Sequence, residues 1–286
     1  MKARPWLTYA LITTVFWGVW GAFVEIPEKA GFPATLGYCV WALTMIVPAF
    51  FALRNNRWKL ETGRRAVFYG LLIGFLGAIG QLVLFHVLIV GPAYLVFPII
   101  SLSPLLTILM SYFILRERAS RRSWMGIVLA LIAIPMLSFQ SHQQGFHGFG
   151  WIWLSLIVFI SWGAQAYYMK VANHHMETAS IFFYMMITGI VLTPIALSMT
   201  DFKSEINWGL KGPYLATLIQ LLNAIGALFL VLAFRYGKAI IVSPLTNAGA
   251  PIITIILSLI IYSTIPHSII ISGMILAILA IFLMAE

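Results

Sequence analysis

The sequence predicts an all-α polytopic membrane protein, with ten transmembrane helices arranged as two inverted five-helix repeats. Two observations carry this prediction. The 286 residues are 62% hydrophobic and 9% charged, whereas a soluble domain carries about 25% charged residues, so lipid is the natural solvent for this chain. The chain also contains one long pattern twice, and prolines interrupt both copies at corresponding places.

The repeat is clearest in the fourth and ninth predicted helices. The first copy reads GPAYLVFPIISLSPLLTILMSYFILRERASRRSWMG (91–126), and the second reads GKAIIVSPLTNAGAPIITIILSLIIYSTIPHSIIISG (237–273). The paired prolines are Pro98 with Pro244 and Pro104 with Pro251. Each proline removes a helical hydrogen bond and crowds a carbonyl. Helix interruptions at matching places in two halves of a membrane protein are the best sequence indication of a transport site.

Ten apolar stretches are long enough to cross a bilayer, which takes about 20 residues. We expect helices at 6–24, 33–53, 66–89, 93–115, 123–139, 149–169, 179–199, 212–234, 239–262 and 268–284. The first stretch lacks the cleavage site of a signal peptide, so we expect it to span the membrane. The repeats occupy residues 1–141 and 142–286. Because five is an odd number, the second repeat enters the membrane from the opposite side.

Basic residues predict the orientation and the surroundings of the protein. If the N-terminus is cytoplasmic, 14 of the 17 Lys and Arg residues fall in inner segments, and the positive-inside rule then places both termini in the cytoplasm. The net charge of +9 does not indicate nucleic-acid binding, because the basic residues lie in short loops. We expect an integral protein of a bacterial inner (plasma) membrane, with the lipid bilayer and a small-molecule metabolite as partners. The oligomeric state stays open.

The sequence indicates no cofactor, metal site or catalytic group. Cys39 is the single cysteine, so neither a disulfide nor a cysteine-based metal site is expected. The chain has no HExxH motif, no GxSxG motif and no intramembrane carboxylate pair, which a membrane-embedded enzyme would need. We therefore expect a protein that is not an enzyme.

Several motifs in order resemble the EamA-type branch of the drug/metabolite transporter superfamily. They are the WG pair at Trp17, the P-x-x-T segment from Pro104 to Thr107, the turn LRERAS and the run GIVLALIAI. In the second repeat the LxxER turn is degraded, with Ser263 and Thr264 opposite Arg116 and Glu117. The resemblance implies a central cavity lined by helices one to four and six to nine, with the fifth and tenth outside. Members of the family move many unrelated metabolites, often outward, so the resemblance does not specify the substrate.

Aromatic and amide side chains in mid-helix are candidate substrate contacts. Trp17 and Trp20 lie one turn apart, opposite Trp162 and Gln165 of the second repeat. Tryptophan usually lies at the membrane interface, so indoles in mid-span indicate a cavity wall or, alternatively, helix packing beside glycines. The full set of candidates is Trp17, Trp20, Tyr38, Tyr94, Ser101, Trp162, Gln165, Tyr184, Asn223 and Asn247.

The four prolines Pro98, Pro104, Pro244 and Pro251 are candidate hinges. Pro104 frees the carbonyl of Ile100, and Pro251 frees that of Asn247, so each carbonyl must face protein, water or substrate. A kink stabilised by nearby hydroxyls is the alternative.

Ionisable residues inside a membrane usually mark proton relays or ion sites. Glu25 and His86 are possible coupling residues, although each lies toward the outer end of its helix and a structural role is the alternative. Local charge pairing and contact with anionic lipid explain Glu117 between two arginines.

These features together predict a secondary transporter or facilitator of small neutral or zwitterionic organic metabolites, with export as one direction. It would work by alternating access between the two repeats. No deep Arg or Lys pair is present to hold a phosphate, which disfavours sugar phosphates. A sugar permease is the alternative carrier, since tryptophan, tyrosine and asparagine suit hydroxyl binding. A purely structural membrane protein would leave the matched prolines unexplained.

Overall fold

The computed structural model describes residues 4–90, 93–139, 150–262 and 266–285, and within them the regular elements are helices. The first repeat supplies α1 (Pro5–Phe23), α2 (Glu25–Lys29), α3 (Ala34–Thr44), α4 (Ile46–Asn55), α5 (Arg64–Val90), α6 (Ala93–Ser101), α7 (Ser103–Phe113) and α8 (Arg121–Leu137). The second supplies α9 (Gly150–Ala172), α10 (Thr178–Val191), α11 (Thr193–Ser198), the π-helical turn η1 (Leu210–Tyr214), α12 (Leu215–Tyr236), α13 (Ala239–Tyr262) and α14 (Ser268–Met284).

Seven stretches of the described residues are long and apolar enough to cross a membrane. They are 5–29, 34–55, 64–87, 150–172, 178–198, 210–236 and 239–261. The predicted helix at 93–115 is divided into α6 and α7, and α8 and α14 are 17 residues each. The all-helical, polytopic class is therefore confirmed, whereas the count of ten membrane-crossing helices stays a prediction.

Prolines explain where the predicted helices are divided. The divisions at Met45, Leu102 and Leu192 each come two or three residues before a proline. A helical proline has no N–H and crowds the carbonyl four residues earlier, so the turn just before it loses its regular bonding. By contrast, Pro244 and Pro251 lie inside the continuous helix α13, and Pro135 lies inside α8. The matched prolines Pro104 and Pro251 therefore differ, because a division precedes Pro104 whereas α13 continues through Pro251.

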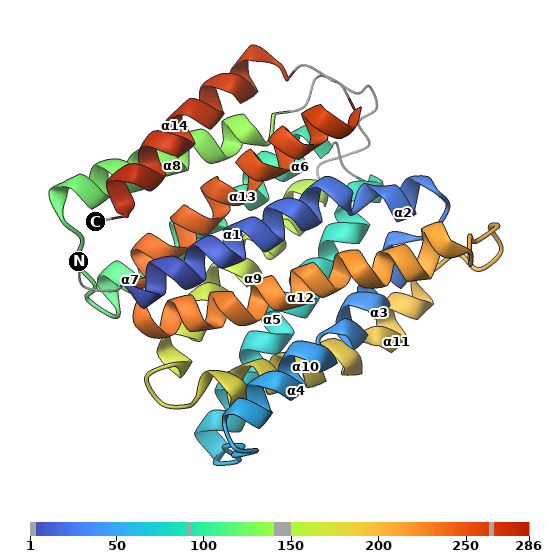
Figure 1. Cartoon of the computed structure of the whole chain (residues 1–286), viewed down its shortest axis with the longest axis horizontal. Helices are drawn as coiled ribbons and strands as arrows, with labels where there is room; N and C mark the ends of the chain where they lie inside the picture. The colour runs from blue at the N-terminus through green and yellow to red at the C-terminus, as the bar shows by residue number, and fades with distance from the viewer. Residues whose placement is uncertain (1–3, 91–92, 140–149, 263–265, 286) are drawn as a thin grey trace.

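Helices from both repeats combine into two groups (Figure 1). Helix α1 packs against α12 and α13, whereas α9 packs against α5 and α7. We call α1, α12 and α13 the first bundle and α5, α7 and α9 the second bundle. The bundles meet mainly where α13 contacts α7. Helices α8 and α14 pack against each other at one edge of the molecule.

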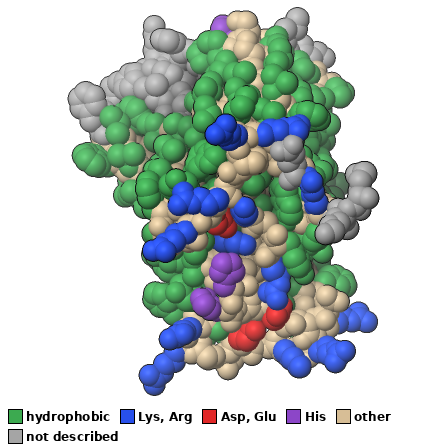
Figure 2. Space-filling view, turned by 90° about the vertical axis from the view of Figure 1, so that its left-hand side faces the viewer, with side chains coloured by type: hydrophobic (Ala, Val, Ile, Leu, Met, Phe, Trp, Pro, Cys, Tyr) green, Lys and Arg blue, Asp and Glu red, His purple; other side chains and the backbone are tan. Residues whose placement is uncertain are grey.

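Both termini lie at the same end of the molecule. Arg4 Nη1 donates a hydrogen bond of 2.7 Å to the carbonyl of Ala285. Figure 2 shows this side, where Lys and Arg side chains gather between apolar flanks. The apolar flanks suit contact with lipid tails, and the basic groups suit contact with lipid headgroups.

Candidate functional site

Two tryptophans make the same contact, once in each bundle. Trp17 Nε1 in α1 donates to the carbonyl of Asn223 in α12, at 3.3 Å. Trp162 Nε1 in α9 donates to the carbonyl of Gly77 in α5, at 3.4 Å. In the repeat, Trp17 corresponds to Trp162 and Asn223 corresponds to Gly77. Each indole N–H therefore bonds a neighbouring helix. Each tryptophan is also partly exposed, so part of it stays accessible.

A threonine–glycine contact is repeated in the same way. Thr254 Oγ1 in α13 donates to the carbonyl of Gly18 in α1, at 2.9 Å. Thr107 Oγ1 in α7 donates to the carbonyl of Gly163 in α9, also at 2.9 Å. Small residues allow helix backbones to approach closely in a membrane, and hydroxyls can then bond across the gap. The first helix of each repeat is therefore fixed against the third and fourth helices of the other repeat.

One turn further along, the two bundles differ in chemistry. Trp20 Nε1 donates to Gln220 Oε1 at 3.1 Å in the first bundle. The corresponding residue Gln165 donates from Nε2 to the carbonyl of Ile73 at 3.1 Å in the second bundle. Gln220 is buried and lines a cavity of about 10 Å³ beside Glu28, which is room for about one water molecule. Sequence analysis alone did not select Gln220, although a polar amide in an otherwise apolar helix is a feature that could have indicated it.

Asn247 differs in exposure from its neighbours in helix α13. It is partly exposed, whereas every other residue from Val242 to Ala250 is buried. Its Nδ2 donates to the carbonyl of Ser243 at 2.9 Å. Helix α13 packs against α1, α7, α8, α9 and α14. Asn247 Oδ1 remains able to accept a hydrogen bond from a ligand.

Other candidates from the sequence lie elsewhere. Tyr38 donates to the carbonyl of Gly189 at 3.0 Å, and Tyr184 donates to the carbonyl of Glu61 at 2.7 Å. The Ser101 hydroxyl lies 2.9 Å from that of Ser138, which links α6 to the peripheral helix α8. The side chains of Tyr94 and Pro98 lie outside the described residues. The structure thus groups Trp17, Trp20 and Asn223 in one bundle and Trp162 and Gln165 in the other.

The two predicted coupling residues lie at the surface in this state. Glu25 Oε2 pairs with Lys29 Nζ at 2.6 Å, and both side chains are more than half exposed. His86 is exposed near the end of α5. Neither contacts the matched tryptophan and threonine sites, so coupling through them stays a prediction.

Comparison with known proteins identifies the family. The model of the EamA-like transporter family matches residues 4–139 and, a second time, residues 149–285. The chain belongs to this family. It is therefore an integral membrane protein of the drug/metabolite transporter superfamily. Both matches together cover nearly the whole chain, in agreement with the predicted resemblance.

Individual relatives are more distant. Protein LicB of Haemophilus influenzae is 24% identical over 209 residues, which cover 69% of this chain and 70% of LicB. An uncharacterized protein of Methanocaldococcus jannaschii is 28% identical over 128 residues, which cover 45% of this chain and 92% of that protein. A solved protein crystal structure superposes with a TM-score of 0.78 at 16% identity, covering 97% of this chain and 98% of the other. At that identity the likeness supports the fold alone.

In this EamA-like chain the prolines of the central helices offer a direct test of the hinge hypothesis. Replacing Pro251 by alanine restores the N–H that can bond the carbonyl of Asn247, so we expect α13 to become stiffer and transport to slow by about tenfold, or about 1.4 kcal/mol in barrier. Pro104→Ala should act in the same direction, because it allows α6 and α7 to join. Transport rate per folded protein is the measurement.

Pro135→Ala provides the matched control, since this proline lies inside α8 at the edge of the molecule. It should change transport little. If all three variants slow transport alike, or if expression falls as much as transport does, the central prolines serve folding and not motion.

Three polar residues at the end that holds both termini were not predicted to act together. Lys170 of α9, Glu117 between α7 and α8, and Lys238 between α12 and α13 are brought to one place. In the sequence, each of these residues is only a charged side chain at the end of an apolar stretch. Contact with lipid headgroups explains such a position equally well. The partners lie 64 to 123 residues away in the chain, so only the fold reveals the contacts.

Proposed function

We propose that this EamA-like protein is a secondary transporter or facilitator that moves small neutral or zwitterionic organic metabolites by alternating access. The family supports membrane transport. The end with both termini and the gathered basic residues would face the cytoplasm of a bacterial cell, because lysine and arginine favour that side. The two repeats would then run in opposite directions through the membrane.

The observation that carries the mechanism is the pair of bundles with matched internal contacts. Trp17 and Gly18 are bonded to α12 and α13, and Trp162 and Gly163 are bonded to α5 and α7 in the same way. Such contacts keep each bundle rigid. The moving units would therefore be the two bundles, each of which contains helices of both repeats, and the substrate would bind between them.

The chemistry of the central residues supports an uncharged or zwitterionic substrate. The partly exposed groups on the candidate list are indole rings, amides and one hydroxyl, namely Trp17, Trp20, Trp162, Gln165, Asn223, Asn247 and Ser101. Indole faces pack against apolar parts of a ligand and attract positive charge, whereas amides donate and accept hydrogen bonds. A singly charged anion would find no counter-charge among these residues.

Counterflow in proteoliposomes tests the proposal without knowledge of the coupling ion. Vesicles are loaded with a pool of unlabelled metabolites, and entry of labelled amino acids, sugars and nucleosides is followed. Accumulation of one class would establish a carrier and name its substrate. Failure of every label to enter, with folded protein, would contradict transport of the proposed classes.

Asn247→Ala tests the site once a substrate is known. Loss of one hydrogen bond to the ligand should raise the concentration for half-maximal counterflow about three- to tenfold. Asn56→Ala is the control, because the Asn56 side chain donates to the carbonyl of Lys59 in the exposed loop between α4 and α5. An unchanged concentration dependence in Asn247→Ala would remove this residue from the site.

A further inference from the structure

Hydrogen bonds between the two bundles gather at one end of the described structure. We call residues 234–240, where α12 ends and α13 begins, the corner. The corner is bonded from the second bundle and its adjoining loops by Lys170, Glu117, Arg118, Met176 and Glu177. The matched tryptophan and threonine contacts, in contrast, lie within single bundles. Separation of the bundles at this end therefore requires the corner to be released.

Lys170 holds the end of α12. Its Nζ donates to the carbonyl of Phe234 at 3.0 Å and to that of Gly237 at 2.7 Å, and the residue is only 8% exposed. The last carbonyls of a helix lack partners within it and carry a partial negative charge. A lysine of α9 in the second bundle thus completes the bonding of a helix in the first bundle.

Glu117 holds the beginning of α13 in the complementary way. Its Oε2 accepts a hydrogen bond of 3.1 Å from the backbone N–H of Ile240. The first N–H groups of a helix need acceptors and favour negative charge. Lys238, inside the corner, donates back to the carbonyl of Arg118. The loop between α7 and α8 and the corner are therefore bonded in both directions.

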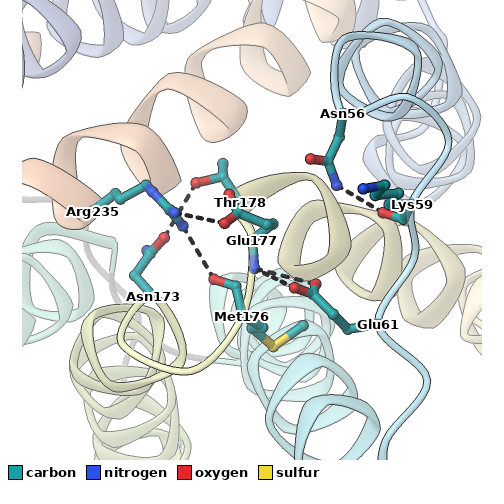
Figure 3. Close-up of polar contacts among 8 residues, drawn as sticks. All are labelled: Asn56, Lys59, Glu61, Asn173, Met176, Glu177, Thr178 and Arg235. Carbon is teal, nitrogen blue, oxygen red and sulfur yellow. Dashed lines mark hydrogen bonds and ion pairs between the residues drawn. The ribbon is translucent and has the colours of Figure 1, made fainter.

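A third contact comes from α12 itself (Figure 3). Arg235 donates from Nη2 to Glu177 Oε1 at 2.8 Å and from Nη1 to the carbonyl of Met176 at 3.2 Å. In the same view, Glu61 accepts from the N–H of Glu177 at 3.1 and 3.2 Å. That last contact joins the starts of α5 and α10, which pack together, so it need not break when the bundles separate.

We propose that the corner is the inner gate of the transporter, held shut by Lys170 and Glu117 and released when the protein opens to the cytoplasm. This inference rests on the proposed alternating access between the bundles. The described state is the one closed at this end. Charged side chains on helix ends suit a gate, because water can replace each bond once the corner moves away.

Cysteine accessibility from the cytoplasmic side measures the gate directly. The background carries Cys39→Ala and Ser243→Cys, since Ser243 lies one turn beyond the corner in α13 and is 3% exposed. Sealed inside-out vesicles are treated with a membrane-impermeant maleimide. Lys170→Met and Glu117→Ala should each raise the labelling rate about threefold, and the double variant about tenfold. Lys211→Met and Glu205→Ala, which change exposed residues near the opposite end, should leave it unchanged.

Unchanged labelling in the folded double variant would overturn the gate. Because the variants could lose folded protein, a second experiment restrains the corner instead. Cysteines replacing Arg118 and Lys238 are joined by a short bismaleimide, which should stop counterflow by at least tenfold relative to either single cysteine. Full counterflow by the cross-linked protein would equally refute the gate. Labelling that responds as expected, in a protein that moves no tested metabolite, would retain the gate and reject the substrate class.

Discussion

Gly18→Ala and Gly163→Ala should each destabilise the protein by about 1–3 kcal/mol, the usual cost of forcing a methyl group into a packed interior. A Cβ at Gly18 would lie 2.5 Å from Ile253 Cβ and 2.9 Å from the carbonyl of Ala250. A Cβ at Gly163 would lie 2.7 Å from both Leu106 Cβ and the carbonyl of Ser103. Because a backbone atom stands in each contact, the helices themselves must separate.

Separation of the helices should also remove the threonine bonds to these glycines, so the loss exceeds that from the methyl group alone. The loss of stability is measured by thermal unfolding in detergent, with the amount of monodisperse protein that remains as the readout. Gly63→Ala is the control, since nothing lies within 4 Å of its added Cβ. Equal stability of all three variants would show that the close approach of α1 to α13 and of α9 to α7 does not support the fold.

The sequence predicted the membrane class and the internal correspondence well, because both depend on residue type and spacing. Trp17 with Trp162 and Thr107 with Thr254 are equivalent in the sequence, and their contacts in the structure are equivalent too. The partner of each residue was not predictable. A repeat shows which residues correspond, but not that the first helix of one repeat packs into the other repeat.

The candidate site was predicted in part for a related reason. Intramembrane amides and indoles are conspicuous, so the sequence singles out Trp17, Asn223 and Asn247 as candidates. Whether such a side chain faces a ligand or bonds a neighbouring helix depends on interatomic distances, which cannot be obtained from the sequence. Glu117 illustrates the same limit, because its neighbours in sequence are arginines while its hydrogen-bond partner is the N–H of Ile240, 123 residues away.

Closure of the proposed gate should depend on pH through Glu117. Burial raises the pKa of this carboxyl above its ordinary value of 4.5, although the N–H groups of Ile240 and Ala239 and the charges of Lys170 and Lys238 lower it. Opening to water would return the pKa toward 4.5. The closed state therefore binds the proton more tightly, so closure strengthens as the pH falls through the raised pKa toward 4.5.

His174, beside Lys170, should act with the opposite sign. Its pKa is lowered from 6.5, first by partial burial and then by the positive charges of Lys170 and His175. The closed state binds this proton less tightly, so closure weakens as the pH falls from 6.5 toward the lowered value. Proton binding to His174 should thus raise the labelling of the Ser243→Cys protein on acidification, whereas proton binding to Glu117 should lower it.

Substitutions separate the two effects. In Glu117→Gln, which keeps an acceptor for the N–H of Ile240, the fall in labelling on acidification should vanish. In His174→Gln, the rise in labelling on acidification should vanish while the fall remains. Each rate is compared with that of the unsubstituted protein at the same pH, because thiol reactivity then cancels. If both variants keep the full profile, neither residue links proton binding to the gate, and the contacts at the corner hold it shut independently of pH.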